Sequence, residues 1–279
     1  MDILIGADPE LFVKRNGKFH SANALIPGSK AEPFRVDNGA VQVDGMALEF
    51  NISPAKEEKE FVHNVESVLG TLREMVPREY TFDFSSVAVF DKDHMAIQPK
   101  EALELGCDAD FNAYSEAQTE PPRTPRQMRA AGGHIHVGWT ENEDPMESSH
   151  FLSCCQIARQ LDYFLGVPSV LLDRSSKRRE MYGKGGSFRP KPYGVEYRVL
   201  SNFWIKSRAS MEFVFSQTRA AFDNLVKKNI NFYREYGQIA KDAIDYNSPD
   251  SAKSFLLHRP QIIGEYSLEA LTERGEVVR

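Results

Sequence analysis

The chain has few cysteines and no long apolar run, and these absences exclude several classes of protein. Its 279 residues include three cysteines, Cys107, Cys154 and Cys155. An odd count with two adjacent members does not suit a disulfide framework and fits a reducing compartment, which predicts a cytoplasmic protein. No run of about 18 apolar residues occurs, so no membrane-spanning helix is expected. No basic region precedes the first apolar residues, so no secretory signal is expected either.

Two common nucleotide-binding motifs are also missing. The sequence contains neither a Gly-x-x-x-x-Gly-Lys-Ser/Thr phosphate loop nor a Gly-x-Gly-x-x-Gly dinucleotide fingerprint. Positive charge is not in excess, because 34 Lys and Arg residues face 40 Asp and Glu residues, a formal net charge of −6. This balance disfavours a dedicated nucleic-acid-binding protein, although basic patches can be local.

What the chain does contain is a set of reactive side chains on alternate residues. His134 and His136 stand in the sequence Gly-Gly-His-Ile-His-Val-Gly, and Glu196 and Arg198 in Val-Glu-Tyr-Arg-Val. Successive side chains of a strand point to opposite faces, so each pair shares one face. Two imidazoles on one strand and a carboxylate beside a guanidinium on another suit a site that holds a metal and a phosphate.

The first 52 residues add acids that would serve as hard oxygen ligands. Asp8 and Glu10 interrupt an apolar strand pattern, and a second predicted strand, Val41–Ile52, carries Asp44 and Glu49. Burying a lone charge is costly, so such acids usually face a cation or an arginine. Each acid alone would more often be solvated or ion-paired, and the histidines alone could be satisfied core residues. The shared pattern of four segments instead favours a site for Mg²⁺ or Mn²⁺.

A basic, glycine-rich segment precedes the Glu-x-Arg strand. Its arginines are Arg174, Arg178, Arg179 and Arg189. Arginine forks and glycine amides suit phosphate oxygens, so the segment is predicted to be a flexible cationic loop that closes over polyphosphate. The alternative is an ordinary solvated loop.

The remaining pattern predicts an α+β fold, in which a mostly antiparallel, curved sheet has a concave catalytic face and helices behind it. Three stretches have apolar residues at helical spacing and are predicted helices: Glu57–Met75, Met146–Val167 and Ser207–Ala240. Phe82–Phe90 is predicted to be a strand that pairs antiparallel near Ile97. The proline-rich Glu116–Arg126 is predicted to be a loop over the site.

Taken in order, these segments resemble a known superfamily. Gly6–Phe12, Val43–Phe50 and the His-x-His and Glu-x-Arg segments resemble strands of the glutamine synthetase and glutamate–cysteine ligase superfamily. Gly106-Cys107-Asp108, Tyr182-Gly183-Lys184 and Tyr193-Gly194 more closely resemble a compact carboxylate–amine ligase branch, type 2, found mainly in phage genomes. The motifs lie within residues 6–204. The resemblance implies one catalytic domain over residues 1–279, like that of glutamine synthetase, with a helical C-terminal part at 207–279.

The resemblance also implies a role for each matching position. Six residues match metal ligands: Asp8, His134 and Glu196 for one metal, and Glu10, Glu49 and Asp44 for another. His136 matches a position that touches nucleotide phosphate, and Arg198 one that steadies the transferring phosphoryl group. Asp8 replaces the usual glutamate, and the spacing from Asp44 to Glu49 differs from that in the larger enzymes.

The implied activity is ATP- and Mg²⁺- or Mn²⁺-dependent joining of a carboxylate to an amine through an acyl phosphate. Glu196 and Arg198 are the implied catalytic residues, and the implied nucleotide-binding residues are His136, Arg174, Arg178, Arg179, Arg189 and Arg198. The substrates would be small molecules or peptides in the cytoplasm, which is the host's if the chain is phage-encoded. Neither their identity nor the oligomeric state follows from the sequence. The alternatives are a guanidino-kinase-like phosphotransferase, which shares the sheet pattern, and a non-catalytic module that binds nucleotide and metal.

Overall fold

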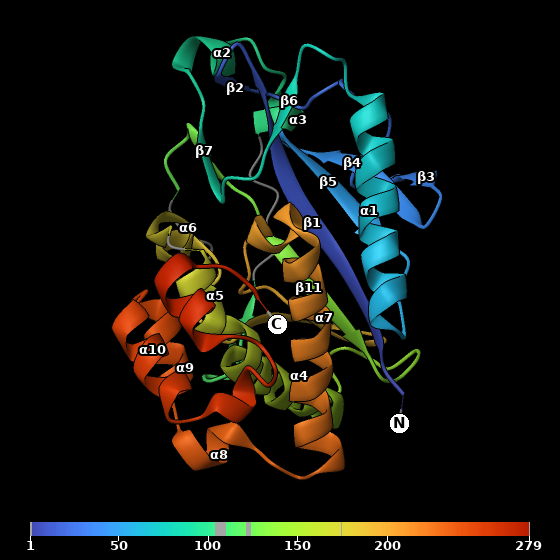
Figure 1. Cartoon of the computed structure of the whole chain (residues 1–279). Helices are drawn as coiled ribbons and strands as arrows, with labels where there is room; N and C mark the ends of the chain where they lie inside the picture. The colour runs from blue at the N-terminus through green and yellow to red at the C-terminus, as the bar shows by residue number, and fades with distance from the viewer. Residues whose placement is uncertain (1, 104–109, 121–123, 174, 279) are drawn as a thin grey trace.

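The computed structural model describes residues 2–103, 110–120, 124–173 and 175–278 of the chain (Figure 1). The strands are β1 (Leu4–Arg15), β2 (Lys18–His20), β3 (Phe34–Val36), β4 (Gly39–Asp44), β5 (Ala47–Ile52), β6 (Thr81–Asp83), β7 (Val87–Val89), β8 (Phe111–Asn112), β9 (Ala117–Gln118), β10 (Met128–Ala130), β11 (Gly133–Gly138), β12 (Ser187–Lys191) and β13 (Gly194–Tyr197).

The helical segments are α-helices, labelled α, and short 3₁₀- or π-helices, labelled η. They are α1 (Glu58–Met75), α2 (Lys92–Ala96), α3 (Lys100–Leu103), α4 (Ser148–Leu161), η1 (Asp162–Gly166), α5 (Val167–Leu172), α6 (Ser176–Met181), η2 (Asn202–Lys206), α7 (Arg208–Phe222), η3 (Asp223–Lys227), α8 (Phe232–Tyr236), α9 (Ile239–Asp245), α10 (Pro249–Leu257), η4 (Pro260–Ile262) and η5 (Ala270–Arg274). None of the helices in the described part of the chain combines the length and apolar character that crossing a membrane would need.

One large antiparallel sheet organises the described residues. Its strand order is β3-β4-β5-β1-β11-β13-β12-β8-β9, with β2 and β6 pairing with the far end of β1. The long strand β1 therefore lies near the middle, between β5 and β11. A separate two-stranded ribbon joins β7 to β10. The α+β architecture with a mostly antiparallel sheet is confirmed.

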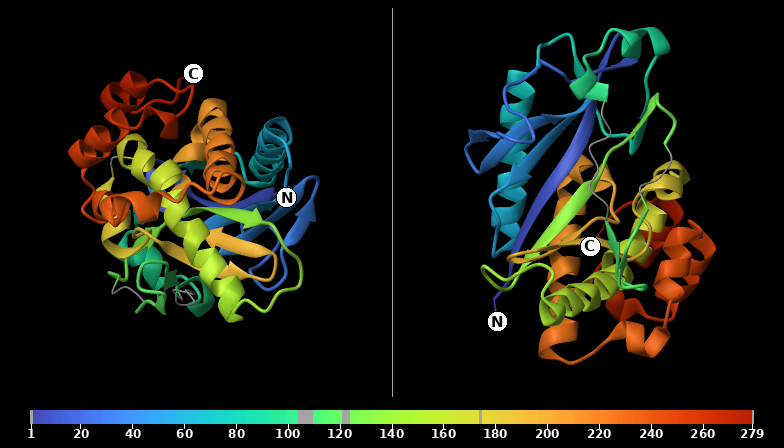
Figure 2. Two further views of the ribbon diagram at one scale, coloured as in Figure 1. Left: turned by 90° about the horizontal axis from the view of Figure 1, so that it is seen from below. Right: turned by 180° about the vertical axis from the view of Figure 1, so that it is seen from behind.

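Helices cover one face of this sheet, which is apolar. Figure 2 shows α1 and α7 on the same side of β1 and β11, and α4 contacts β12 and β13. Alternate strand residues such as Leu48, Ile135 and Val195 are fully buried on this side. In α1, acidic residues in the first turn and Arg73 in the last suit the helix dipole, while its apolar stripe packs inward. The helices therefore leave the opposite sheet face for polar side chains.

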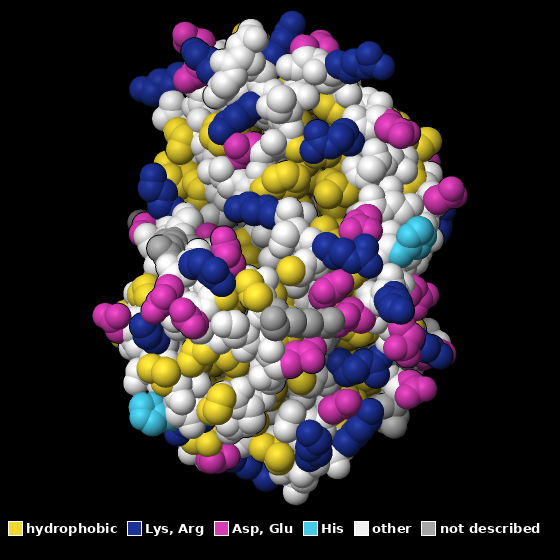
Figure 3. All heavy atoms as spheres, viewed as in Figure 1, with side chains coloured by type: hydrophobic (Ala, Val, Ile, Leu, Met, Phe, Trp, Pro, Cys, Tyr) yellow, Lys and Arg dark blue, Asp and Glu magenta, His cyan; other side chains and the backbone are white. Residues whose placement is uncertain are grey.

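The outer surface on the helical side carries both charges. Figure 3 shows Lys and Arg side chains interspersed with Asp and Glu side chains over this face. The pattern is that of a solvated surface, and it directs the search for a site to the other face of the sheet.

Several predicted elements differ from those observed. The predicted strand Val41–Ile52 is a hairpin, in which β4 and β5 meet at a turn where Gly45 has a φ of 58°. The predicted helix Ser207–Ala240 is interrupted, because Asn229 and Gly237 both adopt positive φ and the chain refolds into α8 and α9. The helix predicted for Met146–Val167 continues through a π-turn into α5.

The segment predicted as one strand, Phe82–Phe90, contains β6 and β7, which have different partners. The Ser85 amide donates to Asp83 Oδ1, which closes a turn between the two strands. β7 pairs with β10 rather than with residues near Ile97, which follows α2. Local alternation predicts extended backbone here, but it does not specify the partner strand.

Candidate active site

Strand register brings the alternating polar residues together on the face away from the helices. Asp8 of β1 lies opposite His134 of β11, and His136 lies opposite Glu196 of β13. On the other side of β1, Glu10 lies opposite Glu49 of β5. Because side chains alternate across each strand, one row of antiparallel pairs carries both the acids and the imidazoles.

The glycines before the His-x-His pair make room for it. A Cβ atom on Gly132 would lie 2.2 Å from His134 Nε2, and one on Gly133 would lie 2.5 Å from both Ser201 O and Trp204 Nε1. The Gly-Gly sequence thus permits the close approach that buries the His134 ring, whose residue is only 5% exposed.

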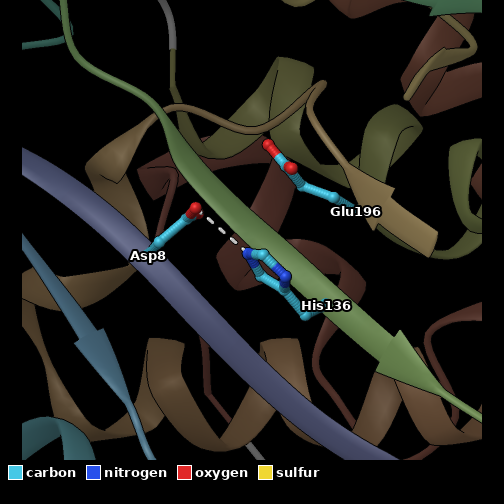
Figure 4. A group of neighbouring side chains, drawn as sticks. All are labelled: Asp8, His136 and Glu196. Carbon is cyan, nitrogen blue, oxygen red and sulfur yellow. Dashed lines mark ion pairs between the residues drawn. The ribbon is translucent and has the colours of Figure 1, made fainter. Parts of the chain in front are cut away.

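The first group of candidate ligands consists of Asp8, His136 and Glu196 (Figure 4). Each offers an oxygen or nitrogen atom, and these atoms lie within 4.8 Å of one another. His136 Nε2 lies 3.1 Å from Asp8 Oδ2, while His134 Nδ1 lies 3.2 Å from Asp8 Oδ1 and 3.7 Å from Glu196 Oε1. Both histidines therefore contact this group, although the sequence assigned its metal-binding imidazole to His134 and a phosphate contact to His136.

Cations surround the carboxylates of this group, which we call the cation-paired group. Glu196 contacts Arg198 Nη1 through Oε1, and Lys191 Nζ lies 2.7 Å from its Oε2. Burial and repulsion from Asp8 act to raise the pKa of Glu196, but Arg198 and the histidines outweigh them and hold it at about 2. Burial is likewise opposed at Asp8, where His136 and His134 hold the pKa well below its usual range. Both carboxylates are therefore ionised.

The second group, which we call the repelling group, consists of Glu10, Asp44 and Glu49. One carboxylate oxygen of each again lies within 4.8 Å of the others. Burial, followed by repulsion from Asp8, Glu10 and Asp44, raises the pKa of Glu49 well above its usual value. Burial also raises the pKa of Glu10, although His134 partly opposes this shift. Three converging carboxylates that repel one another form a donor set that suits a hard divalent cation.

Two cavities adjoin the groups. A cavity of about 640 Å³ is lined by Asp8, Glu49 and His136 and by the aromatic rings of Trp139 and Tyr193. A second cavity, of about 80 Å³, is lined by three other candidate ligands and two arginines, namely Glu10, Asp44, His134, Arg178 and Arg198. Acids of the two groups therefore line both cavities.

Two of the predicted phosphate-binding arginines, Arg178 and Arg179, are buried and donate hydrogen bonds to backbone carbonyl groups. Arg178 and Arg179 lie in the short helix α6 rather than in a flexible loop, and both are 3% exposed. Arg178 donates to Val199 O and Arg198 O and lines the small cavity. Arg179 donates to Ser169 O and Asp173 O and lines neither cavity, which argues against its predicted phosphate contact. Buried carbonyl groups need donors, and these guanidinium groups supply them.

The other two arginines differ from each other. Arg189 Nε lies 3.1 Å from Asp110 Oδ1, and its Nη1 lies 3.9 Å from Glu196 Oε1, so it belongs to the charged network. Arg174 lies outside the described residues. Arg198 contacts Glu196, His134 and Asp110, and the surrounding acids raise its pKa against the effect of burial. Its guanidinium is therefore a fixed positive charge among Glu196, His134 and Asp110.

Three contributors to the site were missed by the sequence reasoning. Lys191 contacts Glu196, Asp110 contacts Arg198, and the Tyr193 hydroxyl lies 2.5 Å from His136 Nδ1. Lys191 could have been found, because it alternates with Arg189 in the same way as the other pairs. Asp110 and Tyr193 lie beside strands rather than within them, so strand alternation gives no signal for either, although Tyr193-Gly194 is part of the resemblance.

Comparison with solved structures relates this fold to a ligase. A bifunctional glutathione synthetase from Pasteurella multocida matches 98% of this chain and 46% of its own, with a TM-score of 0.56 and 12% identity. The chain thus spans less than half of the length of that synthetase, and the likeness concerns the fold. A novel glutamine synthase homolog covers 98% of this chain and 70% of its own, with a TM-score of 0.41 and 10% identity.

A family model matches the central part of the sequence. No curated protein matches the chain. Residues 120–240 match the family model described as Phage phiEco32-like COOH.NH2 ligase-type 2. This segment includes the His-x-His strand β11 and the Glu-x-Arg strand β13. Over this segment, the match agrees with the resemblance that the sequence has to a carboxylate–amine ligase family.

Proposed function

We propose that this protein is an ATP- and divalent-metal-dependent ligase that joins a carboxylate to an amine through an acyl phosphate. The observation that carries the proposal is the pair of three-residue ligand groups on one sheet face. Members of both groups line the large cavity, and Glu10 and Asp44 line the small one. A family described by the same chemistry supports it. Two groups of this kind suit a reaction in which phosphate charge must be neutralised on both sides.

The residues fit metal ions by their donor chemistry. Glu10, Asp44 and Glu49 offer oxygen alone, and Asp8, His136 and Glu196 offer oxygen with one imidazole. Mg²⁺ and Mn²⁺ accept such ligands. When bound, the metals would screen the charge of the nucleotide phosphates during phosphoryl transfer.

The larger cavity suits the nucleotide. Its volume of about 640 Å³ falls in the usual range for small-ligand sites, and Trp139 and Tyr193 provide aromatic surfaces in its lining. With the base against these rings, the polyphosphate would extend toward Asp8 and His136. The small cavity, which Arg178 and Arg198 line, would accept the substrate carboxylate, because guanidinium groups pair with carboxylates in a fixed geometry.

The proposed reaction has two balanced steps. One carboxylate oxygen attacks the γ-phosphorus, and the bond to ADP breaks, which yields an acyl phosphate. The amine nitrogen then attacks the acyl carbon, phosphate leaves with its electron pair, and the amine loses a proton. Arg198 lines the small cavity and is held by Glu196 and Asp110, and it would stabilise the charge of the phosphoryl group in transit.

Hydroxylamine trapping tests the proposal without knowledge of the natural amine. The protein is incubated with ATP, Mg²⁺, hydroxylamine and a pool of ¹⁸O-labelled carboxylates, and hydroxamate, ADP and labelled phosphate are measured. We expect all three products in equal amounts, because each acyl phosphate transfers one carboxylate oxygen to phosphate. Glu196→Gln should yield none of them, and Glu66→Gln, in a surface ion pair with Arg208, serves as the control.

The alternatives give different products. A guanidino-kinase-like activity would form ADP with a guanidinium substrate but neither hydroxamate nor labelled phosphate. A non-catalytic module would bind ATP without forming ADP. Either outcome would overturn the ligase proposal.

A further inference from the structure

Cations hold both oxygens of the Glu196 carboxylate. Arg198 Nη1 contacts Oε1, and Lys191 Nζ lies 2.7 Å from Oε2. The Glu196 side chain is only 2% exposed, so these contacts form in a poorly solvated place where charge interactions are strong. A metal ion that binds Glu196 must therefore compete with a positive charge already on the carboxylate.

The two cations are not equally fixed. Arg198 has a second anchor, because its Nε lies 2.8 Å from Asp110 Oδ1, and its side chain is 11% exposed. Lys191 has Glu196 as its ion-pair partner among the described residues, and its side chain is 32% exposed. An ammonium group on a flexible stem is also easier to move than a guanidinium held at two points. Lys191 is therefore the cation that can leave Glu196 at lower cost.

The position of Lys191 provides an alternative anion. Lys191 ends β12, and Tyr193 in the following turn lines the 640 Å³ cavity and contacts His136. The ammonium group contacts Glu196, and one ligand atom of Glu196 lies within 4.8 Å of those of Asp8 and His136, which line the cavity proposed for the nucleotide. A phosphate oxygen there would offer the same kind of charge-assisted contact that Glu196 now provides.

We propose that Lys191 couples metal binding to nucleotide binding, by leaving Glu196 for a nucleotide phosphate when a metal ion takes the carboxylate. This inference rests on the proposed function. The coupling is reciprocal, so metal and nucleotide each strengthen binding of the other. At the repelling group the nearest lysine contact is looser, since Lys30 Nζ lies 3.5 Å from Asp44 Oδ2, and we expect weaker coupling there.

Titration with Mn²⁺, followed by electron paramagnetic resonance, measures this coupling directly. We compare the wild-type protein, Lys191→Met and Lys227→Met, each with and without a non-hydrolysable ATP analogue. Lys227 is the control because its loss also removes one positive charge and one ion pair, with Asp223 on η3. The site is assigned as the Mn²⁺ binding that Glu196→Gln removes.

Lys191→Met should raise the nucleotide-free Mn²⁺ affinity of this site about tenfold, or about 1.4 kcal/mol. The factor by which the ATP analogue enhances Mn²⁺ binding should fall correspondingly, because the nucleotide no longer has to draw Lys191 away. Lys227→Met should change neither quantity.

The outcomes separate this inference from the proposed function. If Lys191→Met leaves the affinity and the enhancement unchanged, or weakens Mn²⁺ binding, Lys191 does not compete with the metal and the inference is wrong. If the wild-type protein has no Mn²⁺ site that depends on Glu196, the metal site of the proposed function itself is wrong. Should Lys191→Met fail to fold, Lys191→Gln removes the charge while retaining a hydrogen-bond donor for Glu196, and the same expectations apply.

Discussion

The cation-paired group and the repelling group both place buried carboxylates on neighbouring strands, yet their electrostatics are opposite. In the first, Arg198, Lys191 and the histidines hold Asp8 and Glu196 ionised, with the pKa of Glu196 at about 2. In the second, burial and mutual repulsion raise the pKa values of Glu10 and Glu49. The difference shows that the pattern of acids alone does not determine their charge, because nearby cations decide it.

This contrast has a functional consequence. The repelling group gains most from a divalent cation, since the ion would relieve repulsion among three carboxylates. The cation-paired group gains less, because its charge is already compensated. The comparison therefore predicts that equivalent substitutions in the two groups have similar effects on catalysis but different effects on stability.

The largest effect is expected on turnover. Glu196→Gln and Glu49→Gln should each lower the rate of ADP formation by more than about 100-fold, because a catalytic metal supplies several kcal/mol of charge stabilisation. Single-turnover measurements with saturating ATP would show this, with Glu66→Gln as the control. A variant that loses stability but keeps its activity in the folded fraction would identify the substituted acid as structural.

A smaller effect is expected from Arg198→Lys. The rate of the bound complex should fall about 10- to 100-fold, while ATP affinity stays within about tenfold, since the remaining charge still attracts the nucleotide. ATP titration and single-turnover ADP formation measure the two quantities separately. If affinity falls and the chemistry in the bound complex is unchanged, Arg198 contributes to binding only.

The two groups should respond oppositely in thermal unfolding without metal. Glu49→Gln removes a carboxyl group whose ionisation the fold disfavours and should raise the Tm. Glu196→Gln instead leaves Arg198 and Lys191 without their shared carboxylate and should lower the Tm. A change of about 1 kcal/mol corresponds to about 2–4 °C for a protein of this size. Calorimetry in the presence of a chelator provides the measurement. Shifts of the same sign would contradict the electrostatic difference between the groups.

Asp162, on the helical side of the sheet, is a third kind of buried acid, because its partners are neutral tyrosine hydroxyls rather than cations or other acids. It is fully buried, and Tyr197 and Tyr114 donate to it at 2.7 Å and 2.9 Å. Burial raises its pKa to about 7, despite these hydrogen bonds. The folded protein therefore holds a proton that the unfolded chain has lost between about pH 4 and pH 7, so stability falls as the pH rises through this range.

The smallest expected effect is on this pH dependence. Asp162→Asn cannot ionise, so its free energy of unfolding should fall less than that of the wild type between pH 6 and pH 7, by about 1 kcal/mol. Urea unfolding at the two pH values measures the difference. Tyr114→Phe, which removes a hydrogen bond to the carboxylate, should increase the fall. Equal slopes in the wild type and Asp162→Asn would show that Asp162 does not titrate in this range.

Much of the site was predictable because strand alternation is a local property of the backbone. The spacing of His134 with His136, and of Glu196 with Arg198, was enough to place each pair on one face. The apolar residues between them indicated that the other face packs against helices. The structure has both features, although the metal-binding role of these residues stays a prediction.

Other features depend on contacts between distant parts of the chain. The Gly45 turn divides one apparent strand into β4 and β5, and this hairpin aligns Glu49 with Glu10. Arg179 resembles a phosphate-binding residue in sequence, but buried carbonyl groups of α5 and its C-terminal end use its guanidinium. No local pattern specifies such partners, because they depend on which segments pack together.

The sequence by itself determined the chemical types in the site, the face of each strand on which they lie and the resemblance of the central segment to a ligase family. The division of the acids into two groups was expected from the resemblance, and the tertiary structure decided that His136 joins Asp8 and Glu196 and that Lys191 holds Glu196. The physical reason is the distance along the chain over which each property is set. Alternation follows from the geometry of adjacent peptide units, whereas ion pairing, burial and pKa depend on strand register and on packing between residues far apart in the chain.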